Sequence, residues 1–478
     1  MFLVRLDWQK RDASCRIYSV QPFTPFEKED ASVMDHNTLG DIFQEIVVEF
    51  SDMEPTSLDE LEDRVLDAIY RIGSCLMKWK LNDWNTQLRQ DTCDECGCEL
   101  ENRNRERQLA TWVSDISYNR YRSNCPNCGK VEYALDKELG VQPRQRLSSS
   151  VEELAALCGA SWKYEKSEYM MKKVLRRRCV CHETIFNKTN QVGEAASRES
   201  EGSKVKELEE DKKSQGEHFD NMEVWEEPAE RVYMDMDGVM INSRDNKKRM
   251  EGKVSVVWSK RELVKSDAHR DTYSLVDKRY MGSFSDPERF YWDTASELYR
   301  RSGGKMDSVD SFVRGDGAAF IHGFREKYAP RSRYVLDHHH LCEKLKERIY
   351  PLYDSKSRRN EVMDTILDFL ESDNVDVALD YIWGLRRRFR KRYKRKHLQK
   401  LAEYIQRNRE GIWYKEARAK GIPIGSGSAD KTGDILICRR MKLRGMRWSR
   451  ANADNVLTIR ILVLNGEWDA FWETYKAA

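Results

Sequence analysis

The sequence predicts a multidomain α+β protein in which a largely helical amino-terminal half precedes an α/β core. Its 478 residues are enough for roughly two to four domains of ordinary size. Apolar residues recur at helical spacing in the first half, whereas alternating, strand-like segments begin near residue 230. Between the two halves, residues 196–229 are polar and acidic, a composition typical of a linker.

Residues 1–90 are predicted to form a helical region. The segments LGDIFQEIVVEF and LDELEDRVLDAIYRIGSCLMKWK place apolar residues on one helical face, and Ser57 with Glu60 fits a capping box before the second segment. Residues 27–67 contain 14 acidic and 2 basic side chains, so we expect this helical region to be strongly acidic.

Two Cys-x-x-Cys pairs within residues 91–135 predict a zinc ribbon. Cys93 and Cys96 form one pair, Cys125 and Cys128 the other, and a glycine follows each pair. Four thiolates suit one tetrahedral Zn²⁺, and glycine suits the tight turn that such a pair needs. The 28 intervening residues exceed the usual ~15–20, which leaves room for a longer β-hairpin. A redox pair or a coincidence of spacing are the alternatives.

Residues 145–195 are predicted to form a helix-turn-helix-like DNA-binding domain of three short helices. The third helix would present Asn187, Lys188 and Asn190, whose side chains can contact base edges in a major groove. The alternative is a packed three-helix segment whose polar face is only solvated.

Acidic and basic residues are unevenly distributed along this nearly neutral chain. The formal net charge is +2, from 83 basic and 81 acidic side chains. Residues 27–67 carry a net charge of −12 and residues 199–230 carry −8, so the other 405 residues carry +22. A body this basic favours nucleic acid as a partner. No segment approaches the ~18 consecutive apolar residues of a membrane span, and no secretory signal is evident, so we expect a cytoplasmic, nucleoid-associated protein.

The α/β core is predicted to span residues 230–344. In VYMDMDGVMI, Val232, Met234 and Met236 would face one side of a strand, and the intervening residues the other. The segments KVSVVWS and TYSLVDKRYMGSF predict two more strands, followed by a capped helix and two strand-to-helix segments. The resulting order, β-β-β-α-β-α-β-α, matches an RNase H-like core.

The remainder of the chain is predicted to be helical. Residues 345–420 would form an all-helical insertion, and residues 421–478 would contain a catalytic helix and a helical end.

Three aspartates are candidate catalytic residues. Asp237 lies on the first strand of the core, Asp316 at the end of a later strand, and Asp430 at the start of a carboxy-terminal helix. Asp235 shares the strand face of Asp237 and is a candidate supporting residue. Phosphoryl transfer on DNA uses carboxylates that converge on two Mg²⁺ ions, a role that Mn²⁺ could also fill.

The segment LDHHHL supplies a further candidate pair. Successive helical residues point about 100° apart, so three consecutive histidines cannot all bind one ion. Asp337 and His340 are three residues apart and could face each other across one turn. An orienting hydrogen bond near the active site is therefore favoured over metal ligation.

Two basic runs flank the carboxylates. Residues 386–396, RRRFRKRYKRK, contain nine basic side chains, and Phe389 with Tyr393 would anchor one helix face in the protein. The second run, within residues 439–450, contains no acidic residue. Such runs can be merely solvated, but here they favour contacts with a phosphate backbone. The expected DNA contacts are Arg386, Arg387, Arg388, Arg390, Arg439, Arg440, Arg444 and Arg447.

Residues from about 230 to the carboxy terminus resemble the DDE/D transposases of bacterial and archaeal insertion sequences, in particular the Kra-type and Lre-type groups. The likeness rests on VYMDMDGVMI, GDGAAFIHG, VLDHHHLCEKL and IPIGSGSADKTGDILICRRMKLRGMRWSRANADNVLTIRILVLNGEWDAFW, in that order. It implies that Asp237 and Asp316 are the first two acids of a catalytic triad and that Asp337 and His340 form the pair after the fifth strand. The third acid, usually Glu in that family, is Asp430 here.

The resemblance implies a transposase that cleaves DNA strands and joins 3′-hydroxyl ends with two Mg²⁺ ions, beside a structural Zn²⁺. Its partner would be double-stranded DNA, at element ends and at a target. A homodimer or a higher synaptic oligomer is expected because two ends must be held together. The departure at Asp430 keeps open a transposase-derived DNA-binding protein without catalysis, and an RNase H-like nuclease is a third hypothesis.

Overall fold

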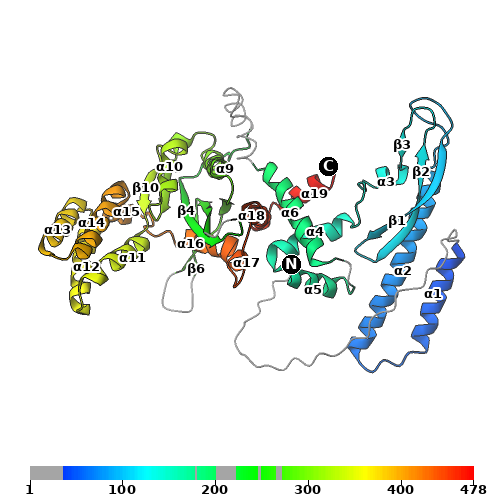
Figure 1. Cartoon of the computed structure of the whole chain (residues 1–478), viewed down its shortest axis with the longest axis horizontal. Helices are drawn as coiled ribbons and strands as arrows, with labels where there is room; N and C mark the ends of the chain where they lie inside the picture. Colours follow the sequence, from blue (N-terminus) through cyan, green and yellow to red (C-terminus); the bar gives the residue numbers. More distant parts are fainter. Residues whose placement is uncertain (1–35, 178–179, 201–221, 246–248, 265–271, 478) are drawn as a thin grey trace. The chain divides into compact units, whose positions relative to one another are not determined.

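The computed structural model describes residues 36–177, 180–200, 222–245, 249–264 and 272–477 (Figure 1). The chain has a mixed α and β, multidomain architecture, as predicted, and divides into two compact units. The first unit comprises Met1–Arg107 and Ser117–Leu135, and the second comprises Gln108–Ile116 and Asp136–Ala478. Residues 27–35 of the first acidic segment and residues 201–221 of the second lie outside the described residues.

A helical hairpin opens the first unit, made of α1 (His36–Ser51) and α2 (Leu58–Gln87). The Ser57 side chain accepts a hydrogen bond from the Glu60 N–H at 3.1 Å, as expected for a helix cap. The Glu60 carboxylate instead accepts from the Thr56 N–H at 3.0 Å, so the reciprocal bond of the predicted capping box reaches one residue further back.

A three-stranded sheet of order β1-β2-β3 follows the hairpin. Its strands are β1 (Glu101–Ala110), β2 (Asp115–Asn124) and β3 (Val131–Glu132). The two long strands account for the extended spacing between the cysteine pairs. Within the first unit, Asn85 of α2 accepts the Tyr121 N–H at 2.8 Å, which fixes the sheet to the helix.

Three helices of the second unit occupy the segment predicted to be helix-turn-helix-like. The third of them, α6, packs closely on the carboxy-terminal helix α18 (Arg450–Asn465). A Cβ at Gly193 would lie only 2.5 Å from the Asn455 carbonyl oxygen, so glycine permits this approach. The three helices are α4 (Ser149–Ser161), α5 (Tyr164–Val174) and α6 (His182–Arg198), and a short helix, α3 (Ala134–Glu138), precedes them.

A five-stranded mixed sheet of order β10-β9-β4-β5-β8 forms the centre of the second unit. Strand β4 pairs antiparallel with β5 and parallel with β9. Strand β8 is antiparallel to β5, and β10 is parallel to β9. The strands are β4 (Arg231–Asn242), β5 (Arg249–Trp258), β8 (Arg279–Ser283), β9 (Asp310–Gly315) and β10 (Arg333–Leu336).

The alternation predicted for β4 is confirmed. Val232, Met234 and Met236 belong to one buried hydrophobic cluster, which also includes residues of the helical insertion. Tyr233 and Val239 belong to a second buried cluster, which includes residues of the carboxy-terminal helices. Since side chains alternate along a strand, β4 separates two cores. Three helices follow strands of this sheet along the chain: α9 (Pro287–Arg301) follows β8, α10 (Ala319–Tyr328) follows β9, and α11 (His338–Ile349) follows β10.

One predicted strand is wrong. The segment 272–284 forms two strands, β7 (Thr272–Leu275) and β8, and β7 pairs with β6 (Arg261–Val264) in a separate hairpin. Asp277 lies between β7 and β8, where the predicted strand is interrupted. Its carboxylate accepts the N–H groups of Ser259 and Lys260 at 3.2 and 3.1 Å, which holds a turn between the two strands.

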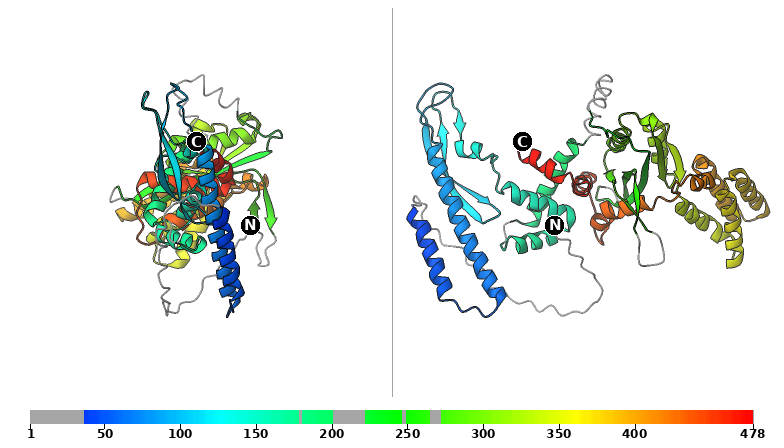
Figure 2. Two further views of the ribbon diagram at one scale, coloured as in Figure 1. Left: turned by 90° about the vertical axis from the view of Figure 1, so that its right-hand side faces the viewer. Right: turned by 180° about the vertical axis from the view of Figure 1, so that it is seen from behind.

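The predicted insertion is helical. Figures 1 and 2 show its helices side by side next to the β10 edge of the sheet. The predicted single helix through the basic run is wrong, because α13 ends before Phe389 and Tyr393 is half-exposed on the next helix. Phe389 does pack against Tyr353, at 5.5 Å between ring centroids. The helices are α12 (Lys356–Glu371), α13 (Val375–Arg388), α14 (Arg392–Arg407) and α15 (Tyr414–Ala419).

The carboxy-terminal segment begins with one continuous helical stretch and ends with two further helices. The stretch contains a π-helical turn, η4, a rare conformation often found at functional sites. The elements are α16 (Gly427–Gly433), η4 (Asp434–Cys438), α17 (Arg439–Met441), α18 and α19 (Trp468–Ala477). Within the described part of the chain, no helix is long and apolar enough to cross a membrane.

Candidate functional site

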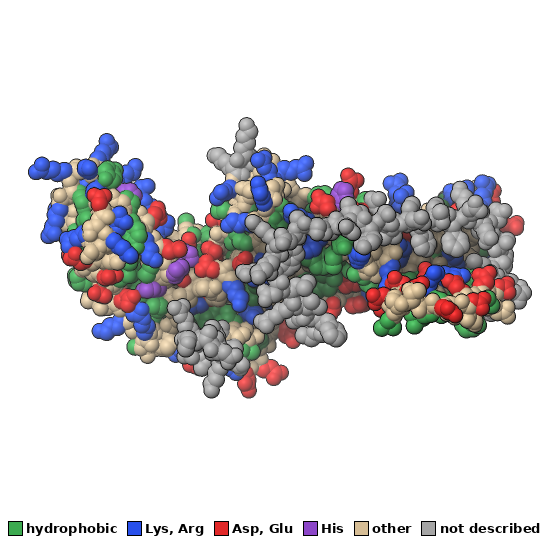
Figure 3. Space-filling model, turned by 90° about the horizontal axis from the view of Figure 1, so that it is seen from below, with side chains coloured by type: hydrophobic (Ala, Val, Ile, Leu, Met, Phe, Trp, Pro, Cys, Tyr) green, Lys and Arg blue, Asp and Glu red, His purple; other side chains and the backbone are tan. Residues whose placement is uncertain are grey.

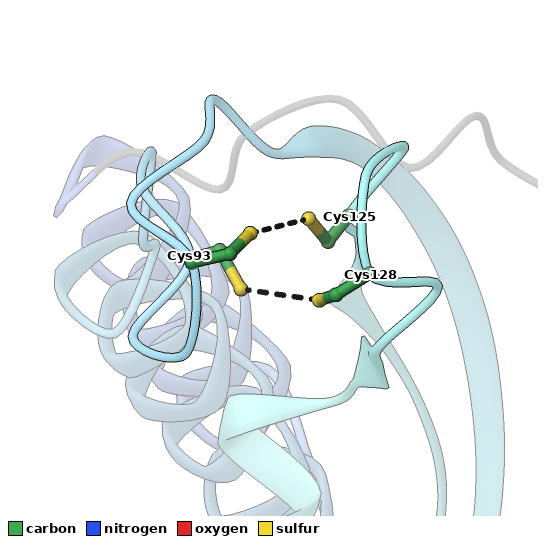
Figure 4. Close-up of side chains that lie close together, drawn as sticks. Cys93, Cys125 and Cys128 are labelled. Atoms are coloured by element: carbon green, nitrogen blue, oxygen red, sulfur yellow. Dashed lines mark hydrogen bonds between the residues drawn. The ribbon is translucent and has the colours of Figure 1, made fainter.

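The four predicted zinc ligands converge in the first unit (Figure 4). The Cys93 and Cys128 sulfurs are 3.7 Å apart, and those of Cys96 and Cys125 are 3.4 Å apart. A tetrahedral ion with Zn–S bonds of about 2.3 Å would place its sulfurs about 3.8 Å apart. These four cysteines could therefore hold a metal ion such as zinc.

The two Cys-x-x-Cys turns have the same backbone geometry. Gly97 and Gly129 adopt positive φ angles of 71° and 76°, which glycine tolerates best. The Gly97 N–H donates to the Cys93 carbonyl at 2.9 Å, and the Gly129 N–H donates to the Cys125 carbonyl at 3.0 Å. The glycines that follow the cysteines thus shape both turns, as the sequence predicted.

The predicted catalytic aspartates come from three elements of the second unit. Asp237 lies on β4 and accepts the Gly238 N–H at 2.7 Å. Asp316 follows the last residue of β9 and accepts the Ala318 N–H at 2.9 Å. Asp430 lies on α16, which packs against β4 and β5, and its side chain is half-exposed.

Electrostatics shows that these carboxylates are neighbours. The pKa of Asp237 is raised to about 6, mainly by burial and also by the negative charges of Asp316 and Asp430, against the opposing hydrogen bond from the Gly238 N–H. A Cβ at Gly433 would lie 3.8 Å from the Asp237 carboxylate, so this face of α16 lies next to Asp237. The sheet and α16 therefore bring Asp237, Asp316 and Asp430 to one region.

The expected hydrogen bond between Asp337 and His340 is present. Asp337 caps α11, accepting the His340 N–H at 2.7 Å, and the His340 Nδ1 lies 3.1 Å from the same carboxylate oxygen. Burial would raise the pKa of Asp337, but the hydrogen bonds from His340 and Ser426 outweigh it and hold that pKa well below its usual range.

His340 connects this pair to the aspartates. Its Nε2 lies 4.0 Å from the Asp430 carboxylate. The hydrogen bond with Asp337 raises the pKa of His340 to about 9, with further help from the charges of Asp430 and Asp316. An imidazolium therefore faces the carboxylate group at neutral pH.

Asp235 has a different environment from Asp237. It is fully buried and pairs with Arg314 of β9 through two contacts of 2.6 Å. The Trp258 indole N–H also donates to it, at 2.8 Å. Arg314 in turn donates to the carbonyls of Pro423 and Gly425 at 3.0 and 2.9 Å. The pair therefore holds the segment that leads to Asp430.

Two serines also hold the segment before Asp430 against the core. The Ser426 hydroxyl donates to Asp337 at 2.8 Å, and its N–H donates to the same carboxylate. The Ser428 hydroxyl donates to Asp235. The motif GSGSAD contained both serines, but only the fold shows that two buried aspartates accept their hydrogen bonds.

The helical insertion also contacts the site, which the sequence did not indicate. The Tyr404 hydroxyl of α14 donates to the Asp316 carbonyl at 2.9 Å. Asn408 is fully buried behind this contact and lies 3.0 Å from the His322 Nε2. A Cβ at Gly317 would collide with the Asn408 side chain at 2.3 Å. The insertion thus supports the turn that carries Asp316.

The aspartate site is less compact than the cysteine site. Among the described residues, the four cysteines are the one group of three or more Cys, His, Asp or Glu whose ligand atoms all lie within 4.8 Å of one another. Asp237, Asp316 and Asp430 are neighbours without forming so tight a cluster.

The residues predicted to contact bases lie on α6 and have mixed environments. Asn187 is exposed. Lys188 instead pairs with Glu152 at 2.6 Å. Asn190 lies 3.3 Å from the Asn455 side chain of α18. Two of the three side chains are therefore engaged within the protein.

The arginines predicted to contact DNA differ in exposure, and the prediction for Arg440 is wrong. Arg440 is 1% exposed, donates to the Gly159 carbonyl at 3.0 Å and stacks over Trp448, so it is a packing residue. Arg386 is half-buried and lies over the Trp383 ring. The remaining side chains are exposed: Arg387, Arg388, Arg390, Arg439, Arg444 and Arg447.

Comparison with known proteins places the chain in a family. A model described as an uncharacterised protein family, UPF0236, matches residues 53–473. A UPF0236 protein of the vanSb 3′ region in Streptococcus gallolyticus is 22% identical over 435 residues, covering 89% of this chain and 88% of that protein. A UPF0236 protein of Caldanaerobacter subterraneus subsp. tengcongensis is 20% identical over 427 residues, covering 88% and 77% respectively. Since the family match spans most of the sequence, the chain belongs to the uncharacterised protein family UPF0236.

Proposed function

We propose that this protein is a DDE/D-type DNA transposase with an RNase H-like catalytic core. One observation carries the proposal. Asp237 on the central strand, Asp316 after the adjacent parallel strand and Asp430 on a helix packed against that sheet lie close enough to influence one another electrostatically. Three carboxylates on such elements form the constellation that phosphoryl transfer on DNA requires.

These aspartates would hold two Mg²⁺ ions, with Mn²⁺ as a substitute. The donor set fits, because carboxylate oxygens suit Mg²⁺, and the negative charges of Asp316 and Asp430 act on the buried Asp237 carboxylate, a repulsion that bound cations would relieve. When bound, the ions would activate an attacking hydroxyl and stabilise the leaving oxygen. The chain itself contributes the placement of Asp316 by Tyr404 and of Asp430 by Ser426 and Ser428.

His340 and Asp337 would act as an orienting pair. Asp337 fixes the imidazole through Nδ1 and leaves Nε2 directed toward Asp430. This cation can orient the Asp430 carboxylate, whose side chain is one methylene shorter than the glutamate common at that position in the resembling family. Asp235 would support the site indirectly, through Arg314.

The proposed substrate is double-stranded DNA, at element ends and at a target. Lys and Arg side chains are prominent over the helical insertion at the left of Figure 3. Exposed arginines on both basic runs can contact phosphates, and a structural Zn²⁺ at the cysteine cluster would stabilise the first unit. A homodimer or higher synaptic oligomer and a nucleoid-associated location in the cytoplasm belong to the same proposal.

Strand cleavage tests the proposal directly. The purified chain would be incubated with a DNA fragment containing its gene and natural flanks, with Mg²⁺ or Mn²⁺, and nicks would be mapped. Asp237→Asn, Asp316→Asn and Asp430→Asn should each reduce cleavage to background. Asp434→Asn is the matched control, because Asp434 is a half-exposed carboxylate four residues after Asp430 that pairs with Arg439. Wild-type cleavage that survives Asp237→Asn and Asp316→Asn would refute the assignment.

A DNA-binding protein without catalysis is the second candidate. It is favoured by the half-exposed, shorter acid at Asp430 and by the looser spacing of the three carboxylates. Salt-sensitive DNA binding with no cleavage by the wild type under any divalent ion would support this alternative. A nuclease would instead cleave without producing joined strands.

A further inference from the structure

A cavity of about 490 Å³ is lined in part by α16, the helix that carries Asp430. Its walls come from β5, the β6–β7 hairpin, the start of β8 and the segment 423–432. Trp258 and Tyr280 form part of the wall, and Gly425 and Gly427 form part of the rim. This volume is within the range of about 300–1,000 Å³ typical of ligand pockets.

Basic side chains line the described part of this cavity. Arg261, Lys278 and Lys431 line it, each from a different element, and no acidic side chain is among the described residues that line it. Arg314 lines it too, but Asp235 neutralises that charge. Neither Lys278 nor Lys431 makes an ion pair with a described side chain, and both are exposed. Among the described residues, Lys278 and Lys431 therefore line one cavity without an acidic ion-pair partner.

The position of Lys431 links the cavity to the aspartates. Lys431 directly follows Asp430 on α16, and successive helical side chains point about 100° apart. Asp430 is directed toward His340, whereas Lys431 lines the cavity. A polymer that crosses α16 could therefore place one group at the carboxylates and a neighbouring group in the cavity.

We propose that this cavity binds a phosphate group, with Lys278, Lys431 and Arg261 as the cationic contacts. Lysine and arginine side chains from three elements can surround a tetrahedral anion, and a compact ammonium is a common phosphate contact. Two sources share this chemistry, the backbone of a nucleic-acid strand and a free phosphate ion. The polymer source rests on the proposed function, because it takes the strand to be the substrate of the adjacent site.

Lysine footprinting of the full-length protein tests the cavity. Acetylation of Lys278 and Lys431 would be measured by mass spectrometry without ligand, with inorganic phosphate, and with a short single-stranded oligonucleotide. We expect several-fold protection of both lysines, with Lys305, an exposed lysine that does not line the cavity, as the internal control. Protection by the oligonucleotide alone indicates a backbone phosphate, and protection by phosphate alone indicates a free anion. Equal acetylation in all three samples overturns the proposal.

A double variant, Lys278→Gln with Lys431→Gln, provides a second measurement. Each lost backbone contact should lower the slope of log affinity against log salt by about 0.7 for a single strand, so the variant should lose roughly one to two in slope. Lys305→Gln should leave the slope unchanged. Protection of the lysines without DNA cleavage would support phosphate binding in the cavity and contradict the proposed transposase activity. DNA cleavage without lysine protection and without a change in slope would support the transposase activity and contradict phosphate binding in the cavity.

Discussion

The cysteine cluster and the aspartate site differ in how the chain assembles them. The cysteines come from two similar turns, and their backbone hydrogen bonds lie within each turn. The aspartates come from two strands and a distant helix, and their positions depend on side chains from several other elements. A local motif can therefore be predicted from spacing alone, whereas the second site exists only when the whole sheet is formed.

Loss of one cysteine ligand should have the largest effect on stability. Cys125→Ser should abolish stoichiometric metal binding and unfold the three-stranded sheet, because a structural Zn²⁺ site contributes on the order of 10 kcal/mol. Metal content by mass spectrometry and thermal unfolding would measure both losses. Cys98→Ser is the matched control, since Cys98 is adjacent but outside the group of four. Full metal content in Cys125→Ser would contradict the cluster.

Removal of Arg314 should be the next largest effect. Arg314→Met leaves Asp235 buried without its partner, which typically costs about 3–5 kcal/mol. Denaturant unfolding would measure the loss. Arg409→Ala, which removes an exposed pair with Asp376, should change stability far less. An Arg314→Met protein as stable as the control variant would show that the pair does not hold the segment before Asp430.

The imidazole of His340 should make stability depend on pH. Its pKa is raised from 6.5 to about 9 in the folded protein, so its stabilising effect is fully present below pH 6.5 and is lost as the pH rises through 9. The difference in unfolding free energy between wild type and His340→Gln should therefore shrink by about 3 kcal/mol between pH 6 and pH 10. A difference that stays constant over this range would contradict the pairing with Asp337.

A smaller effect is expected where α6 meets α18. Gly193→Ala would place a Cβ against the Asn455 carbonyl and should destabilise the protein by about 1–3 kcal/mol. Gly323→Ala is the matched helical control, because nothing lies within 4 Å of its Cβ position. If Gly193→Ala and Gly323→Ala unfold at the same denaturant concentration, α6 is not packed against α18 in solution. The polar face of α6 would then be accessible to DNA, as a recognition helix requires.

The sequence predicted those parts of the fold that depend on neighbouring residues. Alternation identified β4 and its two faces, and the turn residues identified the cysteine cluster. The sequence could not reveal that Asp277 divides a strand-like segment, because its partners are the backbone N–H groups of Ser259 and Lys260. The burial of Arg440 depends on Trp448 and on α4, and α4 is also distant in sequence.

The same distinction applies to the candidate site. Asp237, Asp316 and Asp430 could be selected from their positions relative to predicted strands and helices. The residues that position them could not, since Arg314, Ser428 and Tyr404 act through contacts that only the tertiary fold creates. Asp235 illustrates the limit. Its strand face was predicted, but its partner is a buried arginine.

Electron paramagnetic resonance of bound Mn²⁺ directly tests whether three aspartates that are distant in sequence form one metal-binding site. Mn²⁺ prefers carboxylate ligands, so the cysteine cluster should not interfere. A single site made by the three aspartates requires that the wild type and Asp434→Asn bind Mn²⁺, and that Asp237→Asn, Asp316→Asn and Asp430→Asn each lose most of this binding. Undiminished binding in all three variants would contradict it.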